Sequence, residues 1–323
     1  MNINTPVLLI FFNREKEVMQ VISAIKKCAP KKMYIASDGG RTERERKRIF
    51  RLRKKVKDNI DWDCQLECLF SENNLGCQWG PVSAINWVFS KEERCIILED
   101  DCVPNLSFFE YCDQLLERYK NDERIWMISG ENYLHDESVF EKSDYTFSGR
   151  TNTWGWATWK RAWAKCDFSL HSWPIYKKEN VLLHSYYMKN YDEIEYMTKQ
   201  LDNIYKKIDR SIWDYQWRFH MIINNGLCIV PRKNLISNIG WGKYATHTKS
   251  VKSVFLNVSV GRLNFPIRHP SCIAVNADFD KKYGEMLFWD KVRSYMEKRN
   301  VYEASEMILS HYLKKNKRKE KRR

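Results

Sequence analysis

The sequence predicts an α/β fold in which a mainly parallel sheet is flanked by helices, followed by a more helical second half. Short apolar runs alternate with amphipathic stretches through the first 130 residues. This alternation is typical of parallel strands joined by right-handed helical crossovers. Polar residues follow each apolar run, and the run at 95–98 ends in Glu99-Asp100-Asp101. In open α/β sheets, ligands bind outside the carboxyl ends of the strands.

The elements of the amino half follow from hydrophobic periodicity. We expect strands at 6–12, 33–37, 64–70, 95–98 and 125–129, and helices at 15–27, 41–57, 82–90 and 106–120. Pro104 ends the acidic segment after the fourth strand, because proline cannot donate a hydrogen bond to a strand ladder.

The carboxyl half is less regular. Residues 148–159 are rich in Trp, Gly and hydroxyl side chains, and we expect a loop that runs into a helix at 159–165. Further on we expect helical structure across 179–208, a helix beginning at 212–219, a strand at 228–231 and a loop at 237–248.

The three adjacent acids at 99–101 repel one another and need a compensating charge. Mg²⁺ or Mn²⁺ held by oxygen ligands supplies it, and such ions typically share one or two carboxylates with substrate phosphates. The alternative is an acidic turn without a metal. The sequence has no Gly-x-Gly-x-x-Gly fingerprint and no P-loop. A cation and Arg14 are therefore the groups available to hold phosphates.

Composition narrows the setting. The chain has 323 residues with 13 Trp, whose rings either stack on sugar or base faces or fill the core. Its ten cysteines include no Cys-x-x-Cys pair, which argues against a zinc cage and favours a reducing cytoplasm. The apolar run at 6–12 is too short for a signal peptide, and no run approaches the ~18 apolar residues of a membrane span.

The net charge of +14 is concentrated in two stretches. Residues 41–57 carry a net charge of +8, and Lys314 to Arg323 carry +7. A basic end suits the anionic cytoplasmic leaflet of a membrane. A nonspecific RNA contact and a merely solubilising end are the alternatives.

Several stretches together resemble the GT-A fold glycosyltransferases that use nucleotide sugars, most closely the bacterial family-2-like enzymes and the N-acetylglucosaminyltransferase I type. The similarity covers roughly residues 5–248. The matching stretches are Pro-Val-Leu-Leu-Ile-Phe-Phe-Asn-Arg at 6–14, Ser-Asp-Gly at 37–39, Asn-Asn-Leu-Gly at 73–76, Glu-Asp-Asp at 99–101, Phe-Phe-Glu-Tyr at 108–111, Trp-Gly-Trp at 154–156 and Trp-Asp at 213–214.

The resemblance implies a role for each matched position. Arg14 contacts the diphosphate, Asp38 the uracil or ribose, Asn73 or Asn74 the nucleotide, and Asp100 the ribose or sugar. Asp101 is the main metal ligand, together with Glu99 and with His247 closing over the metal or diphosphate. Asp214 is the general base, and Trp154 and Trp156 offer flat faces to the acceptor. Glu-Asp-Asp replaces the usual Asp-x-Asp, so which acid binds the metal stays open.

Two of these residues also have a purely structural interpretation. Asp214 lies in the first turn of a predicted helix, where a negative charge is stabilised by the helix dipole. His247 lies in a loop, where a single histidine is more often a bystander than a ligand.

The resulting hypothesis is a Rossmann-like GT-A enzyme with a helical acceptor-side region: an inverting, metal-dependent glycosyltransferase for surface polysaccharide synthesis. It divides the chain into a nucleotide-sugar-binding half at 1–132, an acceptor-binding and catalytic half at 133–250, and an extension at 251–323. The donor is UDP-linked, the acceptor is a glycan or lipid-linked glycan, and no specific nucleic acid is expected. The alternatives are a nucleotidyltransferase, which should carry a glycine-rich loop with a lysine after the first strand, and a non-enzymatic binder of lipid or RNA.

Overall fold

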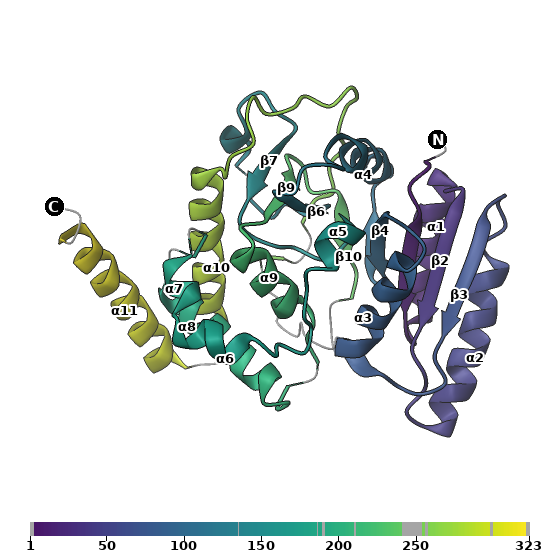
Figure 1. The fold of residues 1–323 in the computed structure, drawn as a ribbon, viewed down its shortest axis with the longest axis horizontal. Coiled ribbons are helices and arrows are strands. Elements are labelled where there is room, and N and C mark those ends of the chain that lie inside the picture. Colours follow the sequence, from purple (N-terminus) through teal and green to yellow (C-terminus); the bar gives the residue numbers. More distant parts are fainter. Residues whose placement is uncertain are drawn as a thin grey trace.

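The computed structural model describes residues 3–134, 136–185, 187–188, 191–209, 211–240, 254–255, 258–297 and 300–320. Within these residues, eight strands form one sheet in the order β3-β2-β1-β4-β8-β6-β9-β7. Helices pack on both faces of this sheet (Figure 1). The mainly parallel α/β sheet flanked by helices is therefore confirmed.

Successive side chains along each strand point alternately into two hydrophobic layers. The sheet contains β1 (Val7–Phe11), β2 (Lys32–Ser37), β3 (Gln65–Phe70), β4 (Arg94–Glu99), β6 (Ile125–Ser129), β7 (Tyr145–Ser148), β8 (Trp156–Trp159) and β9 (Leu227–Pro231). Leu8 and Tyr34 face one layer, whereas Leu9 and Ile35 face the other, as the period of two along a strand requires. A second, two-stranded sheet pairs β5 (Cys102–Pro104) with β10 (Ile236–Asn238).

The helices divide between the two faces. They are α1 (Glu15–Cys28), α2 (Glu43–Asp58), α3 (Gly76–Phe89), α4 (Leu106–Arg118), the 3₁₀ helix η1 (Glu137–Phe140), α5 (Lys160–Trp163), α6 (Trp173–Lys178), α7 (Val181–His184), α8 (Tyr191–Tyr205), α9 (Asp214–Ile223), α10 (Ala277–Glu297) and α11 (Val301–Glu320). Buried side chains of α1, α2 and α4 pack on one face, and those of α3, α9 and α10 pack on the other. In Figure 1, α11 projects from the body at the end of the chain.

One segment of the sheet differs from the sequence-based expectation. Residues 156–159, expected within a loop, form β8, which lies between β4 and β6 and is antiparallel to both. All four residues are buried, and the Thr158 hydroxyl donates to the Trp126 carbonyl at 2.6 Å. The sequence pattern does not indicate this strand, because a central strand covered on both faces shows no apolar–polar alternation.

The amino-terminal boundary of α3 also differs. The helix begins at Gly76 and includes Pro81, whereas we expected it to begin near Val82. A proline inside a helix removes one backbone hydrogen bond. Because α3 continues through Pro81, this proline does not mark where the helix begins.

Among the described residues, no helix combines the length and apolar character needed to cross a bilayer.

Candidate active site

Polar side chains from four strands lie along one edge of the sheet. β1 pairs in parallel with both β2 and β4, and β2 pairs in parallel with β3. The carboxyl ends of these strands therefore share an edge. Arg14 follows β1, Asp38 follows β2, Asn73 and Asn74 follow β3, and the acidic segment 99–101 ends β4.

Arg14 lies against the acidic segment. Its guanidinium forms an ion pair with Asp101 and approaches Asp100 at 3.5 Å. The second oxygen of Asp100 accepts a hydrogen bond from the Phe12 backbone N–H at 3.1 Å. Two carboxylates thus share one guanidinium, and this leaves excess negative charge at the end of β4.

Burial and mutual repulsion favour the protonated forms of these acids. Burial raises the pKa of Glu99 to about 8, and the charges of Asp101 and its neighbours act in the same direction. Burial and the nearby Asp101 raise the pKa of Asp100 to about 7, despite the opposing charge of Arg14. Without a bound cation, this edge therefore resists carrying its full negative charge at neutral pH.

The stability of the metal-free protein is expected to decrease as pH rises from 6 to 8.5. The folded pKa values of Glu99 and Asp100 lie above their ordinary values of 4.5 and 3.8, so the folded state binds more protons between about pH 4 and pH 8. Stability falls with pH wherever the folded state binds more protons. We expect Tm to fall by at least ~2 °C in EDTA. An equal fall in the Glu99→Gln/Asp100→Asn variant would contradict this assignment.

Asp38 organises the loop that follows β3. One carboxylate oxygen accepts from the backbone N–H groups of Gly39 and Leu75, both at 2.8 Å. The other accepts from the Gly76 N–H at 2.8 Å and from the Asn74 side chain at 3.0 Å. Both oxygens are therefore engaged in holding the loop in this conformation.

The ends of β2 and β3 approach closely beside Asp38. The Gly39 N–H donates to the Asn73 carbonyl at 3.2 Å, and a Cβ at Gly39 would lie 2.5 Å from Asn73 backbone atoms. Only glycine fits this contact. The Asn73 side chain itself is exposed at this edge.

Arg53 also belongs to this edge, although its sequence context indicates only one more residue of a basic helix. One terminal nitrogen donates to three carbonyl oxygens at the ends of β2 and β3, those of Ser37 at 3.0 Å, Asp38 at 2.9 Å and Ser71 at 2.7 Å. Its guanidinium also lies over the Phe70 ring, 4.9 Å from the centroid. No spacing pattern within α2 marks this one arginine among the nine basic residues of the helix.

Asn13 points away from the acidic segment. Its side chain donates to Glu45 at 2.9 Å, and Glu45 also receives two hydrogen bonds from the Arg41 side chain. The hydrogen bonds from Arg41 lower the pKa of Glu45 to about 2. Of the Asn13-Arg14 pair, Arg14 is the one that faces the acids.

Asp214 approaches the acidic segment from the other half of the chain. It is the first residue of α9, and its charge contributes to the raised pKa of Glu99. The preceding Trp213 is 6% exposed and stacks on Trp156, with ring centroids 5.7 Å apart. This aromatic contact fixes the position at which α9 begins.

The two tryptophans expected to contact the acceptor occupy different environments. Trp156 is fully buried and packs on Trp163, Trp213 and Trp217, which is the position of a core residue. Trp154 is half-buried, and its ring contacts Tyr133 and Phe255. Of the two, Trp154 is the ring with exposed surface.

Glu131 is a further carboxyl group near the acidic segment. It follows β6 and is 2% exposed, and one oxygen accepts from the Trp154 backbone N–H at 2.8 Å. The other oxygen has no hydrogen-bond partner among the described residues. Burial raises the pKa of Glu131 well above its usual range, with Glu99 and Asp101 adding to the effect. Burial thus favours the protonated form of Glu131, and its hydrogen bond holds the Trp154 backbone.

Glu131→Gln is expected to keep Tm close to that of the unchanged chain, because the amide oxygen still accepts from Trp154. Glu131→Leu removes this acceptor, at a cost of about 1–3 kcal/mol, and should lower Tm. Thermal unfolding of both variants tests this. An equally large fall in Glu131→Gln would contradict the role of this hydrogen bond.

The strand β10 brings a second segment to the acids. β10 pairs antiparallel with β5, and the Ile239 N–H donates to the Asp101 carbonyl at 2.8 Å. A Cβ on Gly240 would lie 2.0 Å from an Asp101 carboxylate oxygen, so a larger residue there would displace the Asp101 side chain. His247, expected near the metal, lies outside the described residues.

No group of three or more His, Cys, Asp or Glu side chains among the described residues is arranged to hold a metal ion by itself. The donor set that is present consists of adjacent carboxylates with one counter-ion. Hard carboxylate oxygens suit Mg²⁺ and Mn²⁺, which often take only one or two protein carboxylates and complete their shell with phosphate and water. The residues present fit such a shared site.

Comparison with known proteins finds solved structures that are similar at low identity and low TM-score. No family model matches the chain, and no curated protein matches it significantly. S. aureus TarS (residues 1–349) is 10% identical, with a TM-score of 0.40, over 72% of this chain and 59% of TarS. GalNAc-T7, solved with UDP, GalNAc and Mn²⁺, is 10% identical, with a TM-score of 0.42, over 71% of this chain and 43% of its own.

A third similar structure is the mannosyltransferase PcManGT from Pyrobaculum calidifontis, solved in complex with GDP-Man and Mn²⁺. It is 11% identical, with a TM-score of 0.33, over 49% of this chain and 45% of that protein. This chain thus spans less than two thirds of each of the three structures that it resembles.

Proposed function

We propose that this protein is an inverting, metal-dependent glycosyltransferase. It transfers a hexose or N-acetylhexosamine from a UDP-sugar to a glycan or lipid-linked glycan during surface polysaccharide synthesis. The observation that carries the proposal is the crowding of Glu99, Asp100 and Asp101 at a strand end beside Arg14. Such a site suits a cation shared with a pyrophosphate.

In this proposal the acids and Arg14 hold the diphosphate of the donor and its ribose or sugar. Asp101, with Glu99, binds Mn²⁺ or Mg²⁺, and Arg14 neutralises charge on the diphosphate. When bound, the cation acts as a Lewis acid that stabilises the leaving diphosphate. Asp100 reaches the ribose or the sugar, and the loop built on Asp38, Asn73 and Asn74 forms the wall for the base.

Asp214 is the proposed general base, which takes the proton from the acceptor hydroxyl. A single base on the face opposite the leaving group gives direct displacement with inversion of the anomeric carbon. Trp154 offers its partly exposed ring to the acceptor sugar. The buried ring of Trp156 packs on Trp213 and Trp217 of the α9 region and does not contact the substrate in this proposal.

The proposal is tested with a panel of nucleotide sugars. Each is incubated with the full chain and Mn²⁺, and released nucleoside diphosphate is measured with and without EDTA. We expect release from at least one UDP-sugar that EDTA abolishes. Release of pyrophosphate from a nucleoside triphosphate and a sugar phosphate, in place of nucleoside diphosphate, would identify a nucleotidyltransferase instead.

We further propose that the carboxyl-terminal end attaches the enzyme to the cytoplasmic face of a membrane. Helix α11 runs to Glu320, so most of the basic stretch from Lys314 to Arg323 belongs to a helix. Each basic residue near an anionic surface contributes about 1 kcal/mol. This attraction requires neither a membrane span nor a lipid anchor.

Truncation after Leu313 is expected to reduce cosedimentation with phosphatidylglycerol vesicles at least ~10-fold, because it removes a net charge of +7. Turnover of a water-soluble acceptor should stay unchanged. Neutral phosphatidylcholine vesicles serve as the control. Equal sedimentation of the truncated and full chains would rule out attachment through this end.

A further inference from the structure

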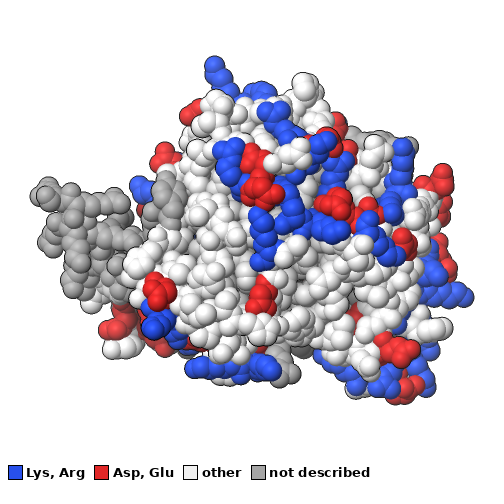
Figure 2. All heavy atoms as spheres, viewed as in Figure 1, with Lys and Arg blue, Asp and Glu red and all other residues white. Residues whose placement is uncertain are grey.

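A second charged region lies at the same edge of the sheet as the candidate active site. It is a pocket of about 330 Å³, and the side chains of Lys142, Arg232, Lys233, Arg262 and Arg268 supply its positive charge. Three acidic residues also line it. In Figure 2, Lys and Arg side chains gather over the upper part of the face shown, with fewer Asp and Glu among them.

The strand topology places this pocket. Arg232 and Lys233 directly follow β9, which runs parallel to β6, and Glu137 lies in η1 after β6. A Cβ at Gly261 would lie 2.8 Å from the Lys233 Cβ. Glycine at this position therefore lets the segment that carries Arg262 close over Lys233 and complete the wall.

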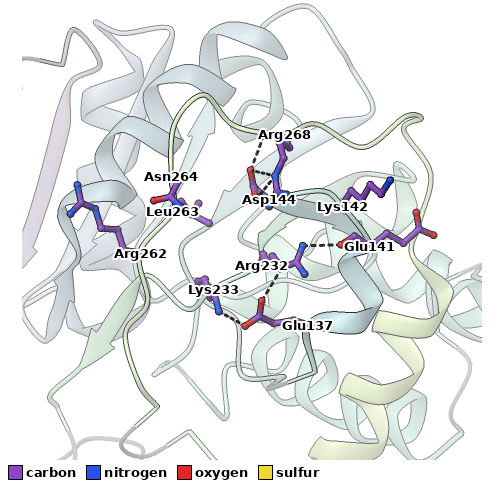
Figure 3. Close-up of a pocket in the computed structure, with 10 residues that line it drawn as sticks. All are labelled: Glu137, Glu141, Lys142, Asp144, Arg232, Lys233, Arg262, Leu263, Asn264 and Arg268. Atoms are coloured by element: carbon purple, nitrogen blue, oxygen red, sulfur yellow. Dashed lines mark hydrogen bonds and ion pairs between the residues drawn. The ribbon is translucent and has the colours of Figure 1, made fainter.

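Most of the acidic charge in the pocket is already neutralised. Glu137 pairs with Arg232 at 2.9 Å and with Lys233, and Asp144 pairs with Arg268 at 2.6 Å. Figure 3 shows Arg232 and Lys233 converging on Glu137, with Arg268 beside Asp144 and with Arg262 and Lys142 at opposite sides. The lining residues carry five positive and three negative charges, so the pocket remains net cationic.

Arg232 is held rigidly in this arrangement. One terminal nitrogen donates to the carbonyl oxygens of Glu141 at 2.9 Å and Ser143 at 3.2 Å, and its Nε donates to Glu137 at 2.9 Å. Burial alone would raise the pKa of Asp144, but its hydrogen bonds from Arg268 outweigh burial and lower it. Arg232 and Arg268 are thus positioned before any ligand arrives, which reduces the entropic cost of binding an anion.

A short extended segment connects this pocket to the candidate active site. Lys233 precedes β10, and the Leu235 carbonyl accepts from the Asn105 N–H at 2.8 Å. Six residues after Lys233, the Ile239 N–H bonds to the Asp101 carbonyl. At about 3.3–3.6 Å per residue, the backbones of Lys233 and Ile239 lie at most ~22 Å apart. An acceptor of several sugar units spans such a distance.

We propose that this pocket binds an oxyanion, a carboxylate or phosphate, on the acceptor glycan, several units away from the hydroxyl that reacts. This inference rests on the proposed glycosyl transfer. It predicts that the natural acceptor is an anionic glycan rather than a neutral one. The cations of the pocket fix the register of the acceptor along the edge of the sheet.

The test compares binding of two hexasaccharides to the 323-residue chain in EDTA by calorimetry. One is a hyaluronan hexasaccharide, which carries carboxylates, and the other is neutral chitohexaose. Lys142→Glu/Arg262→Glu changes the pocket, and Arg51→Glu/Lys54→Glu makes the same charge change on exposed α2 positions. If the charge-reversal variant does not fold, the milder Lys142→Ala/Arg262→Ala variant is measured in its place.

We expect the unchanged chain to prefer the hyaluronan hexasaccharide, with an affinity that weakens as salt rises. The pocket variant should bind it at least ~10-fold more weakly, and the α2 variant should bind it normally. Equal weakening in both variants would overturn the pocket as the site, and equal affinity of the unchanged chain for both sugars would overturn the role of charge.

Two further measurements separate this inference from its rivals. If the pocket variant loses binding to phosphatidylglycerol vesicles but keeps hexasaccharide binding, the site recognises a lipid headgroup and the glycan inference is wrong. Donor turnover by the unchanged chain is measured in parallel. Pocket-dependent hexasaccharide binding without turnover of any nucleotide sugar would leave an anionic-glycan site standing and reject the proposed function alone.

Discussion

Replacing Asp214 with asparagine is expected to lower kcat at least ~100-fold, the usual loss when a general base is removed. Asparagine has nearly the same shape but cannot take the acceptor proton. The packing of Trp213 on Trp156 should hold α9 in place in the variant. Steady-state kinetics with saturating donor and acceptor measure the effect, and the KM for the donor should change little.

Asp278→Asn is the matched control, because Asp278 is an exposed residue in the first turn of α10. Both substitutions remove a charge that stabilises a helix amino terminus by about 0.3–1 kcal/mol. Both should therefore lower Tm slightly, and only Asp214→Asn should lower kcat. Full turnover in Asp214→Asn would discard this residue as the base. A product that retains the anomeric configuration of the donor would discard direct displacement.

Replacing Asp101 with asparagine is expected to lower kcat/KM at least ~100-fold and to weaken the binding of Mn²⁺ in the presence of UDP. Asn supplies a neutral oxygen where the proposal requires a charged ligand, and the leaving diphosphate loses its Lewis acid. Turnover across a Mn²⁺ titration, with calorimetry of Mn²⁺ and UDP binding, measures both effects. Part of the lost turnover should return at high Mn²⁺ concentration.

Asp101 also forms an ion pair with Arg14, so its removal has a structural effect as well. Arg14→Gln breaks the same pair but leaves the carboxylate, and Asp61→Asn changes an exposed acid elsewhere. Mn²⁺ affinity measured without UDP should fall in Asp101→Asn and not in Arg14→Gln or Asp61→Asn, because only Asp101→Asn removes a charged ligand. Unchanged metal affinity in Asp101→Asn, with a loss in Glu99→Gln, would move the main ligand to Glu99.

The edge that carries the acids follows from local sequence. Each apolar run of the amino half is followed by polar residues, and strands joined by helical crossovers pair in parallel. These two facts are enough to place Arg14, Asp38 and the acidic segment along one edge. The structure agrees, with β1 between β2 and β4.

Contacts between residues far apart in the sequence cannot be predicted from such local patterns. Asp144 and Arg268 are 124 residues apart, and β10 reaches β5 from more than 130 residues away. No periodicity records such pairings. Half-buried Arg53 looks like its exposed neighbours in sequence, and only the carbonyl oxygens that converge on it reveal its place.

Local sequence is enough to predict which strands end in charged or amide side chains, because period and polarity are properties of neighbouring residues. Three features appear only in the folded structure: Trp156 belongs to a central strand, Asp214 lies close enough to Glu99 to raise its pKa, and a cationic pocket forms beyond β9. Each of these depends on segments far apart in the chain, whose approach is set by the packing of the whole core.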